Sequence, residues 1–106
     1  MDYMRIGYTT GDRSLTMDFV FMDCGSSIGW RIYIINNVDY KGRNTSFHAT
    51  HRLQAAGETY MYICWAGKIT TLQQAKAVAS LWSDATALYI RNGGSFDEIV
   101  RRLLQN

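Results

Sequence analysis

Apolar side chains recur at helical spacing in the C-terminal third of the chain, beginning after Thr71. At about 100° per residue they fall on one broad face, which is typical of an amphipathic helix of about five turns. This face comprises Ala75, Val78, Ala79, Leu81, Trp82, Ala85, Leu88 and Tyr89. Thr71 and Gln74 fit the capping box that starts a helix, and the pair one residue earlier fits it equally. The pattern predicts a helix over residues 71–91, with Trp82 as its core anchor.

A second, shorter helix is predicted directly after the first. Gly93 accepts the left-handed backbone that often ends a helix, so the first helix should end there. Ser95 and Glu98 form another capping box, and the apolar residues behind them again follow the helical i, i+3, i+4 spacing. These residues are Phe96, Ile99, Val100, Leu103 and Leu104. We therefore expect a helix over residues 95–104.

The rest of the chain shows the two-residue alternation of half-buried strands. Within residues 28–36, for example, Trp30 and Ile32 alternate with Arg31 and Tyr33. The predicted strands cover residues 3–9, 15–24, 28–36, 45–53 and 59–66. Their connections are short, and short connections favour antiparallel neighbours because a parallel pair needs a crossover of a dozen or more residues. A meander is the simplest topology.

Strands followed by helices indicate an α+β fold with the helices on one face of the sheet. We predict a single domain over residues 1–106, with an antiparallel meander of about five strands and two C-terminal helices packed on one face. The uncovered face should carry Arg31 and Tyr33, together with Tyr60 and Tyr62 or their neighbours. Alternation alone does not fix the register of these strands.

Composition narrows the class of protein. Hydrophobic residues make up 47% of the chain, which argues against intrinsic disorder. The net charge of +2 is too small to indicate nucleic-acid binding by itself. The first residues lack the charged-then-apolar pattern of a signal peptide, and no apolar run is long enough to cross a bilayer. We therefore expect a cytoplasmic protein that does not associate with a membrane.

The histidines and cysteines are the candidates for metal binding or catalysis. His48 and His51 are three residues apart, which places them on opposite faces of a strand and predicts no metal site. If this segment is helical or looped instead, they could converge with Cys24 or Cys64. A Cys–His pair with a nearby aspartate would then provide the parts of a nucleophile. Otherwise we expect reduced, unbridged thiols and no cofactor.

The segment from Tyr40 to Arg52 is basic and contains no acidic residue, although the chain as a whole is nearly neutral. Lys and Arg side chains, with an aromatic side chain that can stack, are typical of contacts to acidic surfaces or phosphates. The candidate binding residues are Tyr40, Lys41, Arg43, His48, His51 and Arg52 in this segment, and Arg31 and Tyr33 on the uncovered face of the sheet.

These features favour a small non-catalytic binding protein that contacts a macromolecule, with a protein as the leading partner. The small size, the single α+β domain and the lack of a catalytic motif resemble accessory proteins of phages and mobile elements, some of which inhibit host defence proteins. One alternative is a nucleic-acid-binding module that uses the basic segment. A second alternative is a small enzyme that uses Cys and His, and a homo-oligomer is compatible with each function.

Overall fold

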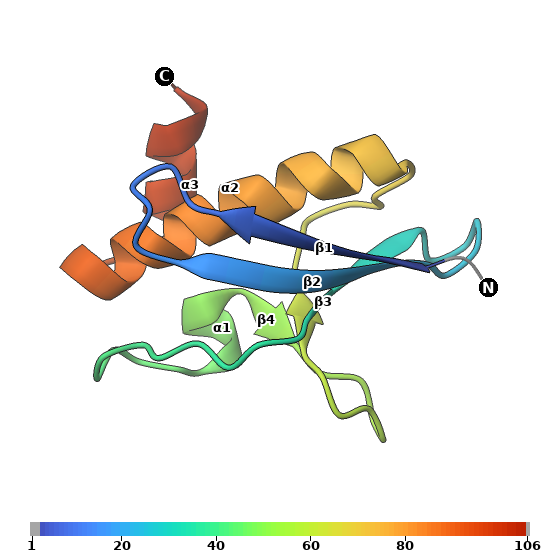
Figure 1. The fold of residues 1–106 in the computed structure, drawn as a ribbon, viewed down its shortest axis with the longest axis horizontal. Coiled ribbons are helices and arrows are strands. Elements are labelled where there is room, and N and C mark those ends of the chain that lie inside the picture. Colours follow the sequence, from blue (N-terminus) through green and yellow to red (C-terminus); the bar gives the residue numbers. More distant parts are fainter. Residues whose placement is uncertain (1–2, 106) are drawn as a thin grey trace.

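The computed structural model describes residues 3–105 and places the elements in the order β1-β2-β3-α1-β4-β5-α2-α3. The strands are β1 (Tyr3–Thr9), β2 (Thr16–Asp23), β3 (Trp30–Ile34), β4 (Arg52–Leu53) and β5 (Tyr62–Ile63). The helices are α1 (Phe47–Thr50), α2 (Leu72–Asn92) and α3 (Phe96–Leu104). The long helix α2 and the strands β1 and β2 dominate the view in Figure 1.

All strand pairs are antiparallel, and they form one five-stranded sheet in the order β1-β2-β3-β5-β4. The predicted α+β class is therefore confirmed, with the two C-terminal helices packed against the sheet. The order differs from a simple meander at one point, because β5 inserts between β3 and β4. Tyr33 of β3 lies opposite Tyr62 of β5, so the fifth strand pairs with both the third and the fourth.

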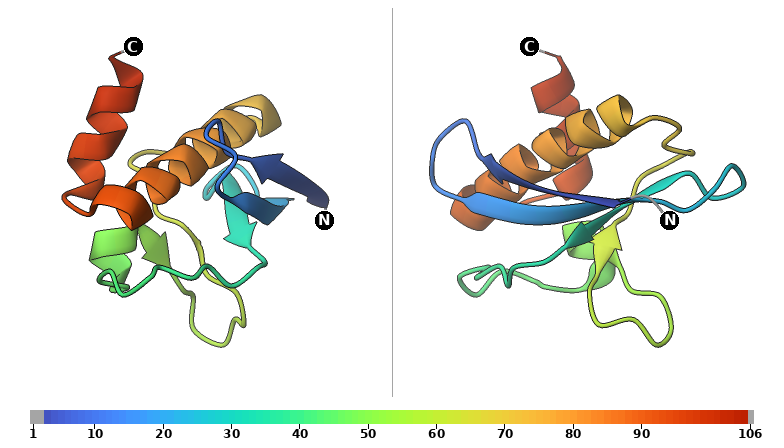
Figure 2. Two further views of the ribbon diagram at one scale, coloured as in Figure 1. Left: turned by 60° about the vertical axis from the view of Figure 1, so that its left-hand side comes forward. Right: turned by 45° about the vertical axis from the view of Figure 1, so that its right-hand side comes forward.

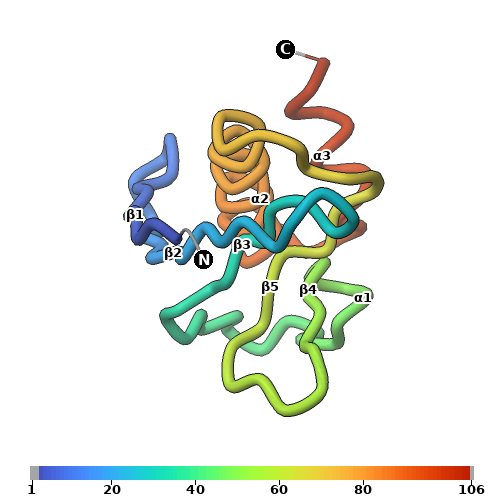
Figure 3. The backbone as a smooth tube through the Cα atoms, turned by 90° about the vertical axis from the view of Figure 1, so that its right-hand side faces the viewer, coloured from blue at the N-terminus to red at the C-terminus, as the bar shows by residue number. Residues whose placement is uncertain are grey.

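Helix α2 covers one face of the sheet, as the end-on view in Figure 3 shows. Trp82 is 1% exposed, and its indole N–H donates to the carbonyl of Thr50 at 3.1 Å. Its ring packs edge-on with that of Phe19 of β2, with the two ring centroids 6.2 Å apart. The largest fully buried apolar side chains are Trp82, Phe19, Phe21, Met17 and Ile32.

Among residues 3–105, no helix combines the length and the apolar character that crossing a bilayer requires.

Both predicted C-terminal helices are confirmed to within one residue at each end. The Thr71 side chain accepts the backbone N–H of Gln74 at 3.0 Å, so Thr71, and not the residue before it, caps α2. Ser95 accepts the N–H of Glu98 at the start of α3. Gly93 ends α2 with a φ of 71°. Figure 2 shows α3 rising steeply from the end of α2.

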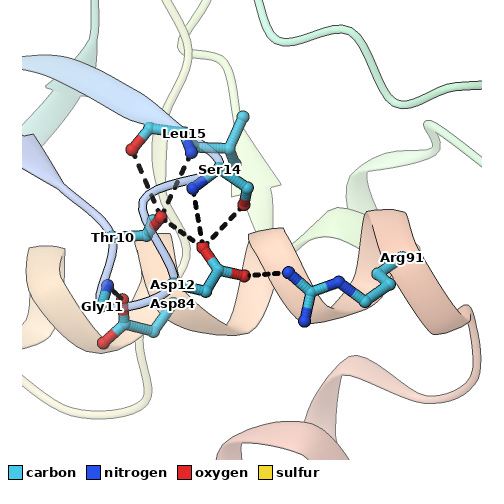
Figure 4. A network of polar contacts seen from close by, with 7 residues as sticks. All are labelled: Thr10, Gly11, Asp12, Ser14, Leu15, Asp84 and Arg91. Atoms are coloured by element: carbon cyan, nitrogen blue, oxygen red, sulfur yellow. Dashed lines mark hydrogen bonds and ion pairs between the residues drawn. The ribbon is translucent and has the colours of Figure 1, made fainter.

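The turn between β1 and β2 is tied to α2 by polar contacts (Figure 4). The carboxylate of Asp84 on α2 accepts the Tyr8 hydroxyl at 3.1 Å and the Gly11 backbone N–H at 3.0 Å. In the turn itself, Asp12 pairs with Arg91 near the end of α2. The free edge of the sheet is thereby fixed to the helix that covers it.

Asp12 should make a pH-dependent contribution to stability. Hydrogen bonds from Ser14, then one from Thr10, together with Arg91, hold the pKa of Asp12 well below its usual value. Replacing it by Asn should lower the free energy of unfolding at neutral pH by about 1–2 kcal/mol, since its charged hydrogen bonds are weakened by the 26% exposure of the side chain.

The direction of the pH effect follows from the lowered pKa in the folded state. The Asp12 contribution is complete above the usual carboxyl pKa of about 4 and is lost as pH falls towards the folded value. The stability difference between the wild type and Asp12→Asn should therefore narrow between about pH 4 and pH 2. Urea denaturation of both proteins across this range measures it, and a difference that stays constant would contradict the assignment.

The prediction of a strand over residues 45–53 was wrong. Residues 47–50 form the one-turn helix α1, and only Arg52 and Leu53 pair as the strand β4. Ser46 caps α1 by accepting the N–H of Ala49 at 3.2 Å, and the Thr50 hydroxyl donates to the Ser46 carbonyl at 2.8 Å. Such local side-chain bonds compete with a strand ladder, which explains the departure from the alternating pattern.

The predicted fifth strand is also shorter than residues 59–66, because only Tyr62 and Ile63 pair. The preceding residues form a loop, 54–61, in which Glu58 N–H donates to the Ala55 carbonyl at 3.1 Å and the Gln54 side chain donates to the Glu58 carbonyl at 2.8 Å. This loop projects away from α2, on the other side of the sheet (Figures 2 and 3).

Candidate functional site

The structure disperses the predicted basic segment. Tyr40 is 4% exposed, and the Arg52 guanidinium lies over its ring at 4.8 Å from the centroid. Arg52 is itself buried, where it donates to the Thr50 hydroxyl at 2.8 Å and to the Thr45 carbonyl at 3.0 Å. These two predicted binding residues therefore pack inside the protein and connect β4 to the loop before α1.

Arg43 also has an intramolecular role. It donates to the carbonyls of Ile90 and Arg91 at 3.1 and 3.0 Å, which are among the unpaired carbonyls at the end of α2. Lys41 and His48 are exposed, and Lys41 pairs with Asp39 at 3.6 Å. The residues predicted from this segment are thus not brought together on one surface.

The second predicted location, the uncovered side of the sheet, is a continuous surface. The register places Val20 opposite Tyr33, Met22 opposite Arg31, and Tyr33 opposite Tyr62, so these side chains share the face away from α2. We call this surface the open face, and it consists of Tyr3, Val20, Met22, Arg31, Tyr33, Ile35 and Tyr62 with the adjoining Tyr60. Arg31 and Tyr33 therefore lie where the alternation placed them.

The 54–61 loop turns part of the open face into a groove of about 390 Å³. The groove is lined by Tyr3, Val20, Met22, Tyr33, Ile35, Glu58, Thr59 and Tyr60. Two of the lining residues, Tyr3 and Tyr60, are 69% and 46% exposed. A mostly apolar, solvent-facing hollow of this kind is typical of an interaction site.

The charges of the open face are engaged within the protein. The Arg31 guanidinium lies 4.5 Å from the Tyr62 ring centroid and donates to the Tyr33 hydroxyl at 3.5 Å. That hydroxyl donates in turn to the Glu58 carboxylate at 3.0 Å. Burial raises the pKa of Tyr33 above its usual value of 10, so the group remains a neutral donor at physiological pH. The charged groups of the open face are therefore fixed in place, and the groove beside them is mostly apolar.

A separate cluster forms where β4 begins and β5 ends. The Cys64 backbone N–H donates to the His51 carbonyl at 2.9 Å, which places the two residues side by side across the strand pair. The His51 Nε2 lies 3.1 Å from the Asp97 carboxylate of α3. The imidazole also stacks on Phe96, with the ring centroids 4.6 Å apart. His51 adopts a left-handed backbone with φ of 52°, which ends α1 and turns the chain into β4.

Two neighbouring hollows meet at this cluster. One, of about 230 Å³, is lined by His51, Cys64, Trp65, Ala66, Trp82, Phe96, Asp97 and Val100. The other, of about 390 Å³, is lined by Phe47, His48, His51, Arg52, Leu53, Cys64 and Asp97. His51, Cys64 and Asp97 line both, so the cluster is reached from two sides.

The sequence left open whether a histidine and a cysteine converge, and the structure pairs the backbones of His51 and Cys64. It keeps Cys24 apart, at the end of β2, and neither thiol is bridged. The pairing of Asp97 with His51 was missed, because an acid in the first turn of a helix is explained by the helix dipole alone. Within residues 3–105, no three His, Cys, Asp or Glu side chains form a group that could hold a metal ion.

Comparison of the chain with protein-family models, with curated proteins and with solved structures finds no match. The open face and the His51–Cys64–Asp97 cluster are therefore interpreted from their own chemistry. The groove of the open face is the more apolar of these hollows, and it lies on the side of the sheet away from α2.

Proposed function

We propose that this protein acts by binding another protein through the open face, without catalysis. The observation that supports this function is the apolar groove beside the 54–61 loop, which remains open to solvent, whereas α2 packs on the opposite face of β1, β2 and β3. Soluble proteins rarely expose contiguous apolar surface without a use for it. Burial of this surface by a partner would supply the hydrophobic free energy of binding.

The residue types on the open face are those that contribute most to protein interfaces. Tyr, Met and Arg are enriched in interface cores, and Tyr and Arg are frequent hot spots. Tyr3 and Tyr60 line the groove and are exposed, so their rings are available to contact an inserted side chain. A tyrosine loses little conformational entropy on binding, so it suits this position.

The chemistry of the groove favours a partner that inserts apolar side chains. Its walls are mostly apolar, and Arg31 already lies over Tyr62. Arg5, which lies beside the open face opposite Val20, pairs with Asp18. A polyanion would find few free cations here, whereas an apolar segment of a protein would displace water from the groove. These contacts support a protein partner over the nucleic-acid alternative.

Site-directed photo-crosslinking in the producing cells tests the proposal. A photoreactive amino acid replaces Tyr60 at the side of the groove or, as a control, Ala77 on the exposed face of α2. We expect a protein adduct of defined mass from position 60 and none from position 77. A nuclease-sensitive adduct at position 60 would support nucleic acid instead. An adduct with a second copy of this chain would identify a homo-oligomer.

If excess unlabelled wild-type protein suppresses formation of the position-60 adduct, binding at the open face is saturable. Adducts that form equally from positions 60 and 77 would contradict the proposal, because they would show random collision. Adducts from position 77 alone would move the interface to the outer face of α2.

A further inference from the structure

We propose that two copies of this protein associate by pairing their β1 strands antiparallel, so that the two five-stranded sheets become one continuous sheet. The pairing uses the outer backbone edge of β1 and not the groove of the open face, so it does not depend on the function proposed for that groove. Figure 3 shows β1 at the side of the sheet, with α2 standing clear of its outer edge.

The hydrogen-bond pattern shows which backbone groups of β1 point outwards. The Asp18 carbonyl accepts the Ile35 N–H at 2.9 Å, so Asp18 uses its backbone on the β3 side and exchanges no bond with Gly7 opposite it in β1. The 2.9 Å bond from Thr10 N–H to the Leu15 carbonyl gives the same alternation. The N–H and C=O groups that point away from β2 are therefore those of Tyr3, Arg5, Gly7 and Thr9. Among the described residues, no other backbone group bonds to them.

The strand β1 lacks the features by which proteins protect the edge of a sheet. Short strands, prolines, lysines, bulges or a covering element commonly do so. β1 has seven residues that pair one to one with β2 without a bulge, and its sequence contains neither proline nor lysine. Its one charged side chain, Arg5, pairs with Asp18 of β2. An exposed edge of this length is a template for another strand.

The sequence of β1 fits a second copy of itself. In an antiparallel pair with its twofold axis at Ile6, all seven residues are paired and every outward-facing N–H meets an outward-facing carbonyl. The cross-strand pairs in this register are Tyr3–Thr9, Met4–Tyr8, Arg5–Gly7 and Ile6–Ile6. An axis at Arg5 would instead place two like charges opposite each other. An axis at Gly7 would leave the first residues of β1 opposite the turn that follows it.

Charge complementarity favours the same register. Arg5 of one copy lies opposite Gly7 of the other, and Asp18 of that other copy lies on the far side of Gly7. The space above Gly7 is open, because among the described residues an added Cβ would meet only the Met17 carbonyl oxygen, at 3.6 Å. The Arg5 side chain can therefore extend across Gly7 to the Asp18 carboxylate of the other copy, two strand spacings or about 10 Å away at the backbone. The ion pair within each copy is thus available for exchange across the interface.

Disulfide cross-linking tests both the pairing and its register. In a Cys24→Ser, Cys64→Ser background, Ile6→Cys places a thiol on the twofold axis, where the two Cβ atoms stand about 4.5–5.5 Å apart. Met4→Cys is the matched control on the same side of β1, because two copies of position 4 lie about 14 Å apart in this register. Met4 is also more exposed than Ile6, so random collision favours position 4.

We expect the wild type to sediment at twice the mass of the chain. Under mild oxidation, Ile6→Cys should form the linked dimer at least about tenfold faster than Met4→Cys, since pairing gives the two thiols at position 6 a high effective concentration. Equal or faster cross-linking from position 4 would overturn the proposal, because it would show collision without this register.

Gly7→Pro tests the backbone hydrogen bonds of the interface. The Gly7 N–H points away from β2, so proline at this position removes no bond within the sheet. Gly7→Ala is the control, because it keeps the N–H. We expect Gly7→Pro to raise the dissociation constant of the dimer at least about tenfold, since each copy loses a hydrogen bond, and Gly7→Ala to change it less than about threefold.

Sedimentation equilibrium measures these constants, and circular dichroism confirms that each variant is folded. A wild-type protein that sediments as a monomer would overturn the proposal. A folded Gly7→Pro variant that dimerises as tightly as the wild type would do the same, because the outer edge of β1 would then play no part in the association.

Discussion

Replacing Trp82 with alanine is expected to lower the free energy of unfolding by about 3–5 kcal/mol. Trp82 is 1% exposed and packs between the sheet and α3, against Phe19 and Phe96. Its removal leaves a cavity that the strands of a hydrogen-bonded sheet cannot close. The Thr50 carbonyl also loses the indole donor at 3.1 Å, so a buried acceptor is left unpaired.

Urea denaturation of the purified protein measures this loss. Trp65→Ala is the matched control, because Trp65 is only partly buried and lines the small hollow instead of the core centre. We expect the control to lose clearly less stability than Trp82→Ala. A loss below about 1 kcal/mol for Trp82→Ala would show that α2 does not pack through this residue.

The second large effect is expected for Gly29→Ala. This substitution should lower the free energy of unfolding by about 2–4 kcal/mol, through backbone strain and a steric clash. Gly29 has a φ of 85°, a backbone conformation that residues with a side chain rarely adopt. An added Cβ would overlap the Ile69 carbonyl oxygen and come within 2.8 Å of the Lys68 side chain. The Ile69 carbonyl cannot move freely, because it accepts the Trp30 N–H at 2.8 Å and joins β3 to the segment before α2.

Gly25→Ala separates the two causes. Gly25 has a similar φ of 92°, but nothing lies within 4 Å of an added Cβ. The Gly25→Ala variant should therefore lose only about 1 kcal/mol of its free energy of unfolding, from backbone strain alone. Thermal denaturation of both variants compares them, and equal losses would contradict the close approach of Gly29 to Ile69.

The sequence predicted the parts of the fold that local patterns determine. The apolar stripe and the capping residues at Thr71 and Ser95 located α2 and α3, because both signals lie within the helices themselves. The prediction of a strand over residues 45–53 was wrong, since the alternation resembled a strand while Ser46 supplied a helix cap. The insertion of β5 beside β3 was not predictable, because it depends on contacts between distant segments.

The candidate sites were likewise predictable only where local sequence patterns determine them. Alternation placed Arg31 and Tyr33 on the uncovered face, but the groove also requires the 54–61 loop, whose path is set by tertiary contacts. The charges of Arg43 and Arg52 were visible in the sequence, and their partners inside the protein were not. The pairing of His51 with Asp97 joins two helices and a strand end that only the fold brings together.

The most direct test of the open face is an affinity measurement with the partner identified by crosslinking. Tyr3→Asp with Tyr60→Asp places charges at the sides of the groove, on exposed residues where substitution costs little stability. Lys41→Glu reverses an exposed charge in the basic segment and serves as the control. Calorimetry should show at least about a hundredfold weaker binding for the tyrosine double variant and a change below about threefold for Lys41→Glu. Unchanged binding by the double variant, with weakened binding by Lys41→Glu, would contradict binding through the open face.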